Sequence, residues 1–193
     1  MRWVVSLSVA GCIPVLHSED GGAASEWVAP ENGWPISEPP AGLEAEGYED
    51  GQVVPDVRGI DVYGDEVSLW QFYGSLVVLD LSTQWCSPCR ELAEGVQETA
   101  DHFGEELVYV TLMPEDTEGE PVDEEDLADW AEYYGIVTEP VLADPEGYAY
   151  DVVPPGSVEG WPAVFVVDRD LRVHERVGEP TDANIRAVVT EIL

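Results

Sequence analysis

The chain has 193 residues and is strongly acidic: 41 aspartate and glutamate side chains against seven arginines, with no lysine, give a formal charge of −34. Nucleic acids and anionic lipid surfaces are bound through clusters of lysine and arginine, so this composition excludes both as partners of the folded protein. The length and an apolar content of 45% predict one folded domain with appended segments.

Residues 1–17 have the order of a secretory signal, in which Arg2 precedes a short apolar run and then small residues. The run is too short to cross a bilayer, which takes about 20 apolar residues. Residues 9–12, Val-Ala-Gly-Cys, resemble the lipobox of bacterial lipoproteins, which implies that Cys12 is lipidated and anchors the protein to a membrane of the cell envelope. The alternative is a trimmed signal in which Cys12 has no role. Export predicts an oxidising, extracytoplasmic or periplasm-facing location, where neighbouring cysteines form disulfides.

Residues 18–52 are rich in Gly, Pro and Glu and have neither the period of a strand nor that of a helix. Such a segment buries too little apolar surface to offset the entropy lost on ordering. We therefore expect a disordered acidic tether. The alternative is that Trp27 and Trp34 dock on the domain.

The folded domain is predicted over residues 53–193. Two short segments, 53–61 and 66–69, flank a Gly-Asp turn and predict a hairpin at its start. Residues 76–81 form a nearly continuous apolar run, which is typical of a strand covered on both faces. Apolar residues then recur at helical spacing from Cys89 to Phe103 and predict one helix.

Further elements alternate to the end of the chain. Residues 107–113 predict a strand, and Asp123 is placed to cap a helix that ends at Gly135. Residues 163–167 predict a buried strand that turns into a second strand over 172–177, and a last helix begins at Thr181 or Asp182. This order predicts an α/β sandwich, with helices packed on a central mixed sheet. The acidic run 115–126 lacks EF-hand spacing, and we interpret it as a solvated loop.

Cys86 and Cys89 lie between the buried strand and the helix that follows it, three residues apart. At a helix N-terminus, unpaired N–H groups and the helix dipole stabilise a thiolate, which is the nucleophile in disulfide exchange. A pair of this spacing also occurs in zinc sites, but the remaining candidate ligands, Cys12 and three histidines, are scattered along the chain. An inert structural disulfide is a further alternative.

The sequence resembles the thioredoxin superfamily over residues 51–193, most closely the TlpA/ResA-like bacterial thiol-disulfide oxidoreductases. The resemblance depends on residues 78–90, VLDLSTQWCSPCR, and on residues 160–168, GWPAVFVVD. It implies a thioredoxin-like three-layer sandwich, with a mixed sheet flanked by helices and an N-terminal hairpin. It also implies catalysis by the two thiols alone, without a cofactor or metal.

The resemblance assigns a role to each matching residue. It makes Cys86 the attacking thiol and Cys89 the resolving thiol, and it makes Pro162 a cis-proline beside the disulfide. Asp80 matches the buried acid that exchanges a proton with the resolving thiol, and burial should raise its pKa. Trp85 is expected to form an apolar platform beside the site.

Two positions depart from the family pattern. Trp161 replaces the small or β-branched residue that is common before the proline, which puts the breadth of the substrate range in doubt. Glu94 stands where relatives often carry a helix-kinking proline, so we expect a straighter helix.

The expected activity is reduction of disulfides in client proteins, with electrons resupplied by a membrane donor protein. No histidine lies between the cysteines, and Ser87 and Pro88 favour a reductant. Two alternatives have partial support. A thiol peroxidase would use Thr83, but Leu79 stands where that motif needs proline; a copper-delivery module would space its cysteines by three residues instead of two.

Overall fold

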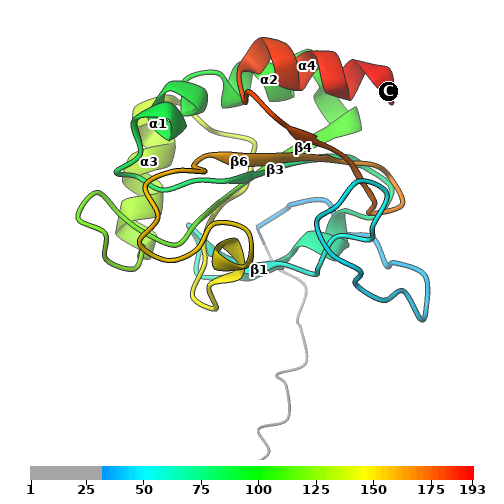
Figure 1. The fold of residues 1–193 in the computed structure, drawn as a ribbon, viewed down its shortest axis with the longest axis horizontal. Coiled ribbons are helices and arrows are strands. Elements are labelled where there is room, and N and C mark those ends of the chain that lie inside the picture. The colour runs from blue at the N-terminus through cyan, green and yellow to red at the C-terminus, as the bar shows by residue number, and fades with distance from the viewer. Residues whose placement is uncertain (1–31) are drawn as a thin grey trace, which may run out of the picture.

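The computed structural model describes residues 32–193, which form a seven-stranded mixed sheet packed against helices (Figure 1). The strand order is β2-β1-β5-β4-β3-β6-β7, in which β3, β4 and β5 are parallel. The strands are β1 Arg58–Asp61, β2 Glu66–Ser68, β3 Leu76–Leu81, β4 Leu107–Met113, β5 Val141–Ala143, β6 Ala163–Val167 and β7 Val173–Val177. The fold class expected from the sequence is confirmed, including the antiparallel hairpin of β1 and β2 at the N-terminal side of the sheet.

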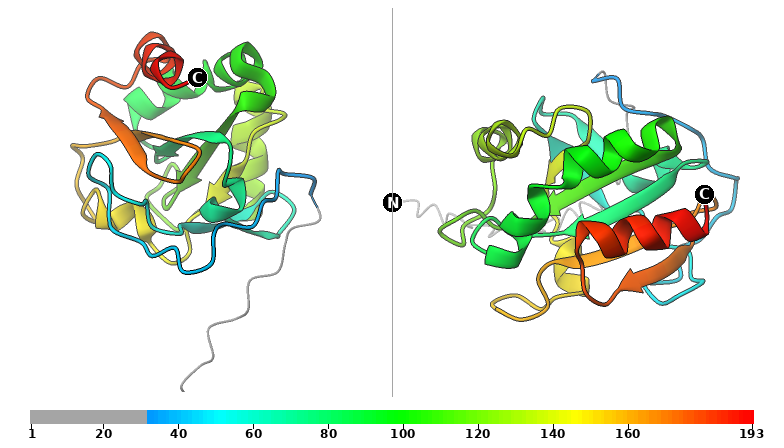
Figure 2. Two further views of the ribbon diagram at one scale, coloured as in Figure 1. Left: turned by 90° about the vertical axis from the view of Figure 1, so that its right-hand side faces the viewer. Right: turned by 90° about the horizontal axis from the view of Figure 1, so that it is seen from above.

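The four α-helices are α1 Ser87–Ala93, α2 Val96–Phe103, α3 Glu124–Tyr134 and α4 Asp182–Glu191. Apart from Cys89 and Ala100, their buried apolar side chains pack into one hydrophobic cluster on one face of the sheet. In the view from above, α1, α2 and α4 lie over the strands (Figure 2). The opposite face is covered by the 3-10 helices η1 Leu69–Phe72 and η3 Tyr148–Asp151 and by the chain before β1. A further short 3-10 helix, η2 Gly104–Glu106, follows α2.

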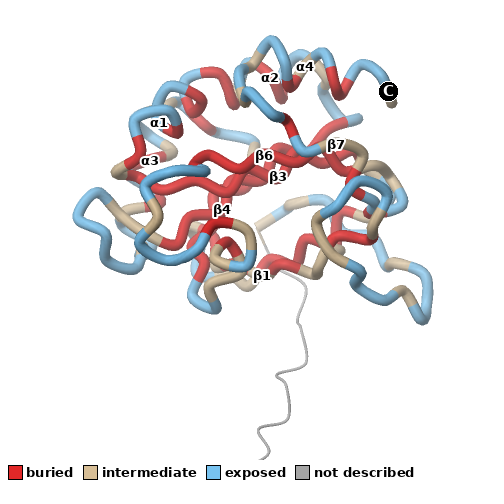
Figure 3. Tube along the Cα trace, in the orientation of Figure 1, coloured by how far each residue is buried: buried red, intermediate tan, exposed pale blue. Residues whose placement is uncertain are grey.

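The burial of strand β3 explains why its sequence is apolar except at Asp80. Val77, Leu79 and Leu81 belong to the cluster on the η1 and η3 face, whereas Leu76 and Val78 belong to the cluster under the α-helices. Successive side chains of a strand point to opposite faces, so a strand covered on both sides has no polar face. The central strands are accordingly buried along their whole length (Figure 3).

The helix ends follow the capping signals in the sequence. The Asp123 carboxylate accepts hydrogen bonds from two backbone N–H groups of the first turn of α3, and Gly135 ends that helix in the left-handed conformation. The Thr181 side chain caps α4. These caps set the direction in which each helix leaves the sheet.

The expected straight helix from Cys89 to Phe103 is wrong, because α1 ends at Ala93 and α2 begins at Val96. The break is at Gly95, whose N–H bonds to the carbonyl of Leu92 instead of continuing the α-helical pattern. The Asp182 carboxylate packs against the Gly95 Cα, in the space that a Cβ would occupy. The break in this helix therefore occurs at a glycine. Strand β5 was also missed, because three residues are too few to show a period.

Residues 32–52, which belong to the expected tether, lie against the domain. The buried carboxylate of Asp61 accepts hydrogen bonds from the side-chain N–H groups of Asn32 and Trp34, the latter at 2.9 Å. The Gln71 side chain donates to the carbonyl of Pro35 at 3.1 Å. Hydrogen bonds of this kind join residues far apart in the sequence and produce no regular apolar spacing. The composition of the segment therefore did not predict them. Trp34 is therefore docked on the domain.

The sequence predictions for Cys12, Trp27 and the signal region lie outside the described residues. Within residues 32–193, no helix combines the length and the apolar character needed to span a membrane.

Candidate active site

The two cysteines of the CxxC motif form a disulfide at the start of α1, with their Cα atoms 5.3 Å apart. Cys86 is the N-cap residue, and its sulfur accepts a hydrogen bond from the Cys89 N–H at 3.2 Å. Pro88 fits the first turn, where the N–H that proline lacks has no helical partner. The helix N-terminus therefore places the Cys89 N–H against the Cys86 sulfur, where it favours a thiolate in the reduced protein.

The loop that carries the disulfide is held by Arg90. Its guanidinium donates to the carbonyls of Gln84 and Trp85, at 2.9 and 3.1 Å. Both cysteines are enclosed, and Cys86 retains 4% of its surface against 1% for Cys89. The difference is small, but Cys86 is the more exposed of the two, as an attacking thiol has to be.

The loop before β6 lies next to the disulfide. The peptide bond between Trp161 and Pro162 is cis. Trp161 is buried in the same hydrophobic cluster as the two cysteines, and its indole N–H donates to the carbonyl of Ser157 at 3.1 Å. The indole thus packs inward and is fixed at its polar end.

Asp80 is buried on β3, six residues before Cys86. Its carboxylate accepts a hydrogen bond from the Ser82 hydroxyl at 2.6 Å. Loss of solvent on burial raises the pKa of Asp80 to about 7, and the Ser82 hydrogen bond lowers it only in part. The raised pKa expected from the sequence is confirmed, and a carboxyl group with this pKa can accept and release a proton near neutral pH.

Trp85 is half-buried beside the disulfide loop. Its indole N–H donates to Glu115 at 2.6 Å, and the other oxygen of Glu115 accepts from the Tyr150 hydroxyl at 2.7 Å. Glu115 was expected in a solvated loop, but it is half-buried and bridges two aromatic side chains. The only feature of the sequence that could have indicated this role of Glu115 is its position just after β4, the strand that pairs with β3.

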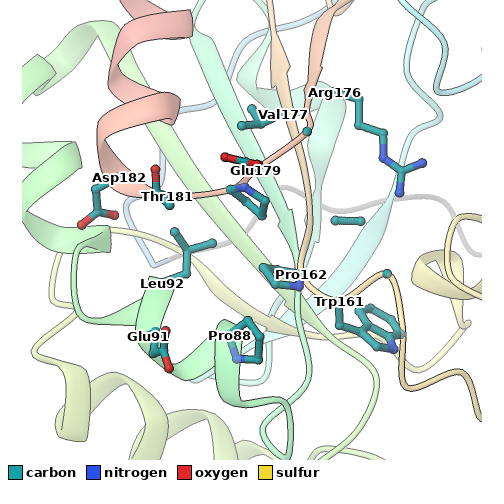
Figure 4. Close-up of a pocket in the computed structure, with 14 residues that line it drawn as sticks. Pro88, Glu91, Leu92, Trp161, Pro162, Arg176, Val177, Glu179, Thr181 and Asp182 are labelled. Carbon is teal, nitrogen blue, oxygen red and sulfur yellow. The ribbon is translucent and has the colours of Figure 1, made fainter.

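A groove of about 740 Å³ runs beside the disulfide loop. It is bounded by the first turns of α1, the Pro162 loop, the end of β7 and the start of α4 (Figure 4). Pro88, which lies between the cysteines, and Pro162 both line it. The groove therefore runs alongside the loop that carries the disulfide. Among residues 32–193, no group of three His, Cys, Asp or Glu side chains is arranged to hold a metal ion.

This fold, with a CxxC disulfide at a helix N-terminus, places the chain in the class of thioredoxin-like thiol-disulfide oxidoreductases. Residues 51–176 match the AhpC/TSA family, so the chain belongs to that family. It is 25% identical to the thioredoxin-like protein YneN of Bacillus subtilis over 122 residues, which are 63% of this chain and 67% of that protein.

Solved structures show the same fold. A DsbF homologue of Corynebacterium diphtheriae is 23% identical with a TM-score of 0.58, over 81% of this chain and 98% of that one. A putative thiol:disulfide interchange protein DsbE of Chlorobium tepidum is 21% identical with a TM-score of 0.61, over 76% and 99%. The exposed lipoprotein thioredoxin Etrx1 of Streptococcus pneumoniae is 24% identical with a TM-score of 0.57, over 70% and 98%.

Proposed function

We propose that this protein is an exported, membrane-anchored reductase of disulfides in client proteins. The observation that carries the proposal is the Cys86–Cys89 disulfide at the N-terminus of α1, beside Pro162 and the groove. Such a pair can pass two electrons to a client and return to the disulfide state. Neighbours of the same fold include a DsbE-type interchange protein and an exposed lipoprotein thioredoxin, which supports an extracytoplasmic location.

The reaction has two exchange steps. The Cys86 thiolate attacks one sulfur of a client disulfide, an S–S bond forms between them, and the other client sulfur leaves as a thiolate and is protonated by water. Cys89 then transfers its proton to the carboxylate of Asp80 and attacks Cys86. The bond between Cys86 and the client breaks, and the second client sulfur leaves as a thiolate and is protonated by water. The client has gained two electrons, and the protein holds the Cys86–Cys89 disulfide. A membrane dithiol protein reduces this disulfide again.

The direction of electron flow is proposed from the residues between the cysteines. Ser87 and Pro88 are exposed and carry no charge, so no imidazolium stabilises the thiolate as in strongly oxidising pairs. Anchoring is proposed from the lipobox resemblance at Cys12.

The first test is a trapping experiment in cells. Cys89→Ser should accumulate mixed disulfides between Cys86 and client proteins, because the resolving thiol is absent, whereas Cys86→Ser should accumulate none. Alkylation of wild-type cells should find the pair mostly reduced; a mostly oxidised pair reverses the direction. Cys12→Ser should release the protein from the membrane fraction, and an unchanged membrane fraction contradicts lipid anchoring.

A further inference from the structure

The groove beside the disulfide has an uneven charge. Three carboxylates line it: Glu91 on α1, Glu179 in the loop after β7, and Asp182 at the start of α4. Figure 4 shows Asp182 and Glu91 on one side of Pro162 and Arg176, the one cation of the lining, on the other. The guanidinium of Arg176 lies 5.5 Å from the centre of the Phe165 ring. The groove therefore has an acidic side, between α1 and α4, and that side has no basic residue of its own.

In the part of the chain that the structure describes, none of these three carboxylates forms an ion pair, although the charge of Arg186, whose ion pair is with Glu98, also acts on Asp182. Among residues 32–193, the ion pairs of Arg58, Arg169, Arg172, His174 and Arg186 all involve other acids. Glu91 and Glu179 are exposed, and one oxygen of Asp182 is buried without a hydrogen-bond partner in this part of the chain. Unpaired carboxylates in a concave site attract a cation more strongly than scattered surface acids do, because low-dielectric walls concentrate the field.

The remaining lining of this side is apolar. Leu92 and Val177 are buried, and the rings of Pro88 and Pro162 line the groove beside them (Figure 4). An occupant that matches such a surface has an apolar stretch beside its disulfide and a positive charge within reach of the acids. The methylene stem of lysine or arginine suits this combination, since it packs on apolar surface and ends in a charge.

From this geometry we infer that the groove selects client segments carrying a lysine or arginine next to the cysteine, with Glu91, Glu179 and Asp182 as the residues that determine specificity. The inference rests on the proposed reductase function, since it names the clients of the same site. Segments with acidic residues beside the cysteine are disfavoured by the same carboxylates.

The test uses three small disulfides that differ in charge: cystamine (positive), 2-hydroxyethyl disulfide (neutral) and 3,3′-dithiodipropionate (negative). The fully reduced protein is mixed with each, and its oxidation to the Cys86–Cys89 disulfide, with release of two thiols, is followed by quenched thiol labelling. Each rate is divided by the rate of dithiothreitol with the same disulfide, which removes intrinsic reactivity. We expect cystamine to be preferred over dithiodipropionate by roughly 100-fold at low salt. At about 1 M salt, where charges are screened beyond about 3 Å, the preference should fall several-fold.

A pair of matched variants separates the groove from the overall charge. The groove variant is Glu91→Gln/Glu179→Gln/Asp182→Asn. The control, Glu44→Gln/Asp50→Asn/Glu105→Gln, changes exposed acids at the opposite end of the sheet, and both variants move the net charge from −34 to −31. In the groove variant, the ratio of the normalised rates with cystamine and with dithiodipropionate should fall at least tenfold. In the control variant, this ratio should stay at the wild-type value.

Each outcome has a distinct meaning. Equal normalised rates for the three disulfides overturn the charge selection and leave the reductase proposal standing. An equal loss of preference in both variants overturns the role of the groove, because the field of the whole protein would then explain the preference. Exchange no faster than that of dithiothreitol with all three disulfides overturns the proposed function itself.

Discussion

Replacing Asp80 by asparagine tests the physical environment that we assign to this carboxyl group. Asp80 is fully buried, and its pKa rises from the ordinary value of 3.8 to about 7 because burial removes solvent from the charged form. The folded protein therefore holds the proton more tightly than the unfolded chain, so its stability falls as pH rises between these two values. At roughly 1.4 kcal/mol per pKa unit, the ionised carboxylate destabilises the fold by about 4 kcal/mol above pH 7.

The assay is urea unfolding of the oxidised protein at pH 5 and pH 8, since the disulfide keeps both cysteines from titrating. From the same two pKa values, Asp80 should remove about 2.5 kcal/mol of unfolding free energy between these pH values in the wild type. In Asp80→Asn, the amide oxygen can still accept the hydrogen bond from Ser82. The variant should not show this loss of unfolding free energy between pH 5 and pH 8. Burial also raises the pKa of Glu139 to about 7, but Glu139 is present in both proteins and cancels in the difference.

Asp129→Asn, at an exposed acid on α3, is the control and should reproduce the wild-type pH dependence. The reasoning is refuted if Asp80→Asn and the wild type lose the same unfolding free energy between pH 5 and pH 8. That result would mean that solvent or an unrecognised partner stabilises the Asp80 charge, and the carboxyl group would then be a poor proton acceptor for Cys89.

Three further predictions concern the surroundings of the site. Gly95→Ala should destabilise the protein although alanine favours helices, because its Cβ would clash with the Asp182 carboxylate; in urea unfolding, Asp182→Ala should restore most of the loss. Glu115→Ala removes two hydrogen bonds and should lower the unfolding free energy by about 1–3 kcal/mol, with a shifted Trp85 indole N–H resonance; an unmoved resonance contradicts the contact. In the reduced protein, alkylation of Cys86 at neutral pH should speed up as salt rises, because salt screens the acidic field that opposes a thiolate; rates independent of salt would contradict this field.

The elements found from the sequence are those whose burial repeats along the chain. Residues 76–81, 107–113 and 163–167 were predicted as strands with the bounds that the structure has, because a strand buried on both faces is apolar at nearly every position. The caps of α3 and α4 were predicted because a capping bond joins residues two or three positions apart. Strand β5 was not found, since its three residues are defined by their neighbours β4 and β1.

The site also contains residues that the local sequence predicted and contacts that it did not. Cys86, Cys89 and Asp80 lie within ten residues of one another, and the strand and the start of the helix that hold them were predicted from the local sequence. Glu115 contacts Trp85 across 30 residues, and only its position just after β4 distinguishes it in the sequence from the acids that follow. The docking of Trp34 on Asp61 across 27 residues is of the same kind.

The sequence by itself determined the sheet strands, the position of the cysteine pair at a helix N-terminus and the burial of Asp80, because each follows from the spacing of residues a few positions apart. Only the tertiary structure decided that the active-site helix breaks at Gly95 and that acids from α1 and α4 meet in one groove. Both places involve Asp182, which lies almost a hundred residues from the cysteines: it packs against Gly95, and it lines the groove. Side chains that far apart come into contact through the packing of α4 on the sheet, and no local pattern encodes that contact.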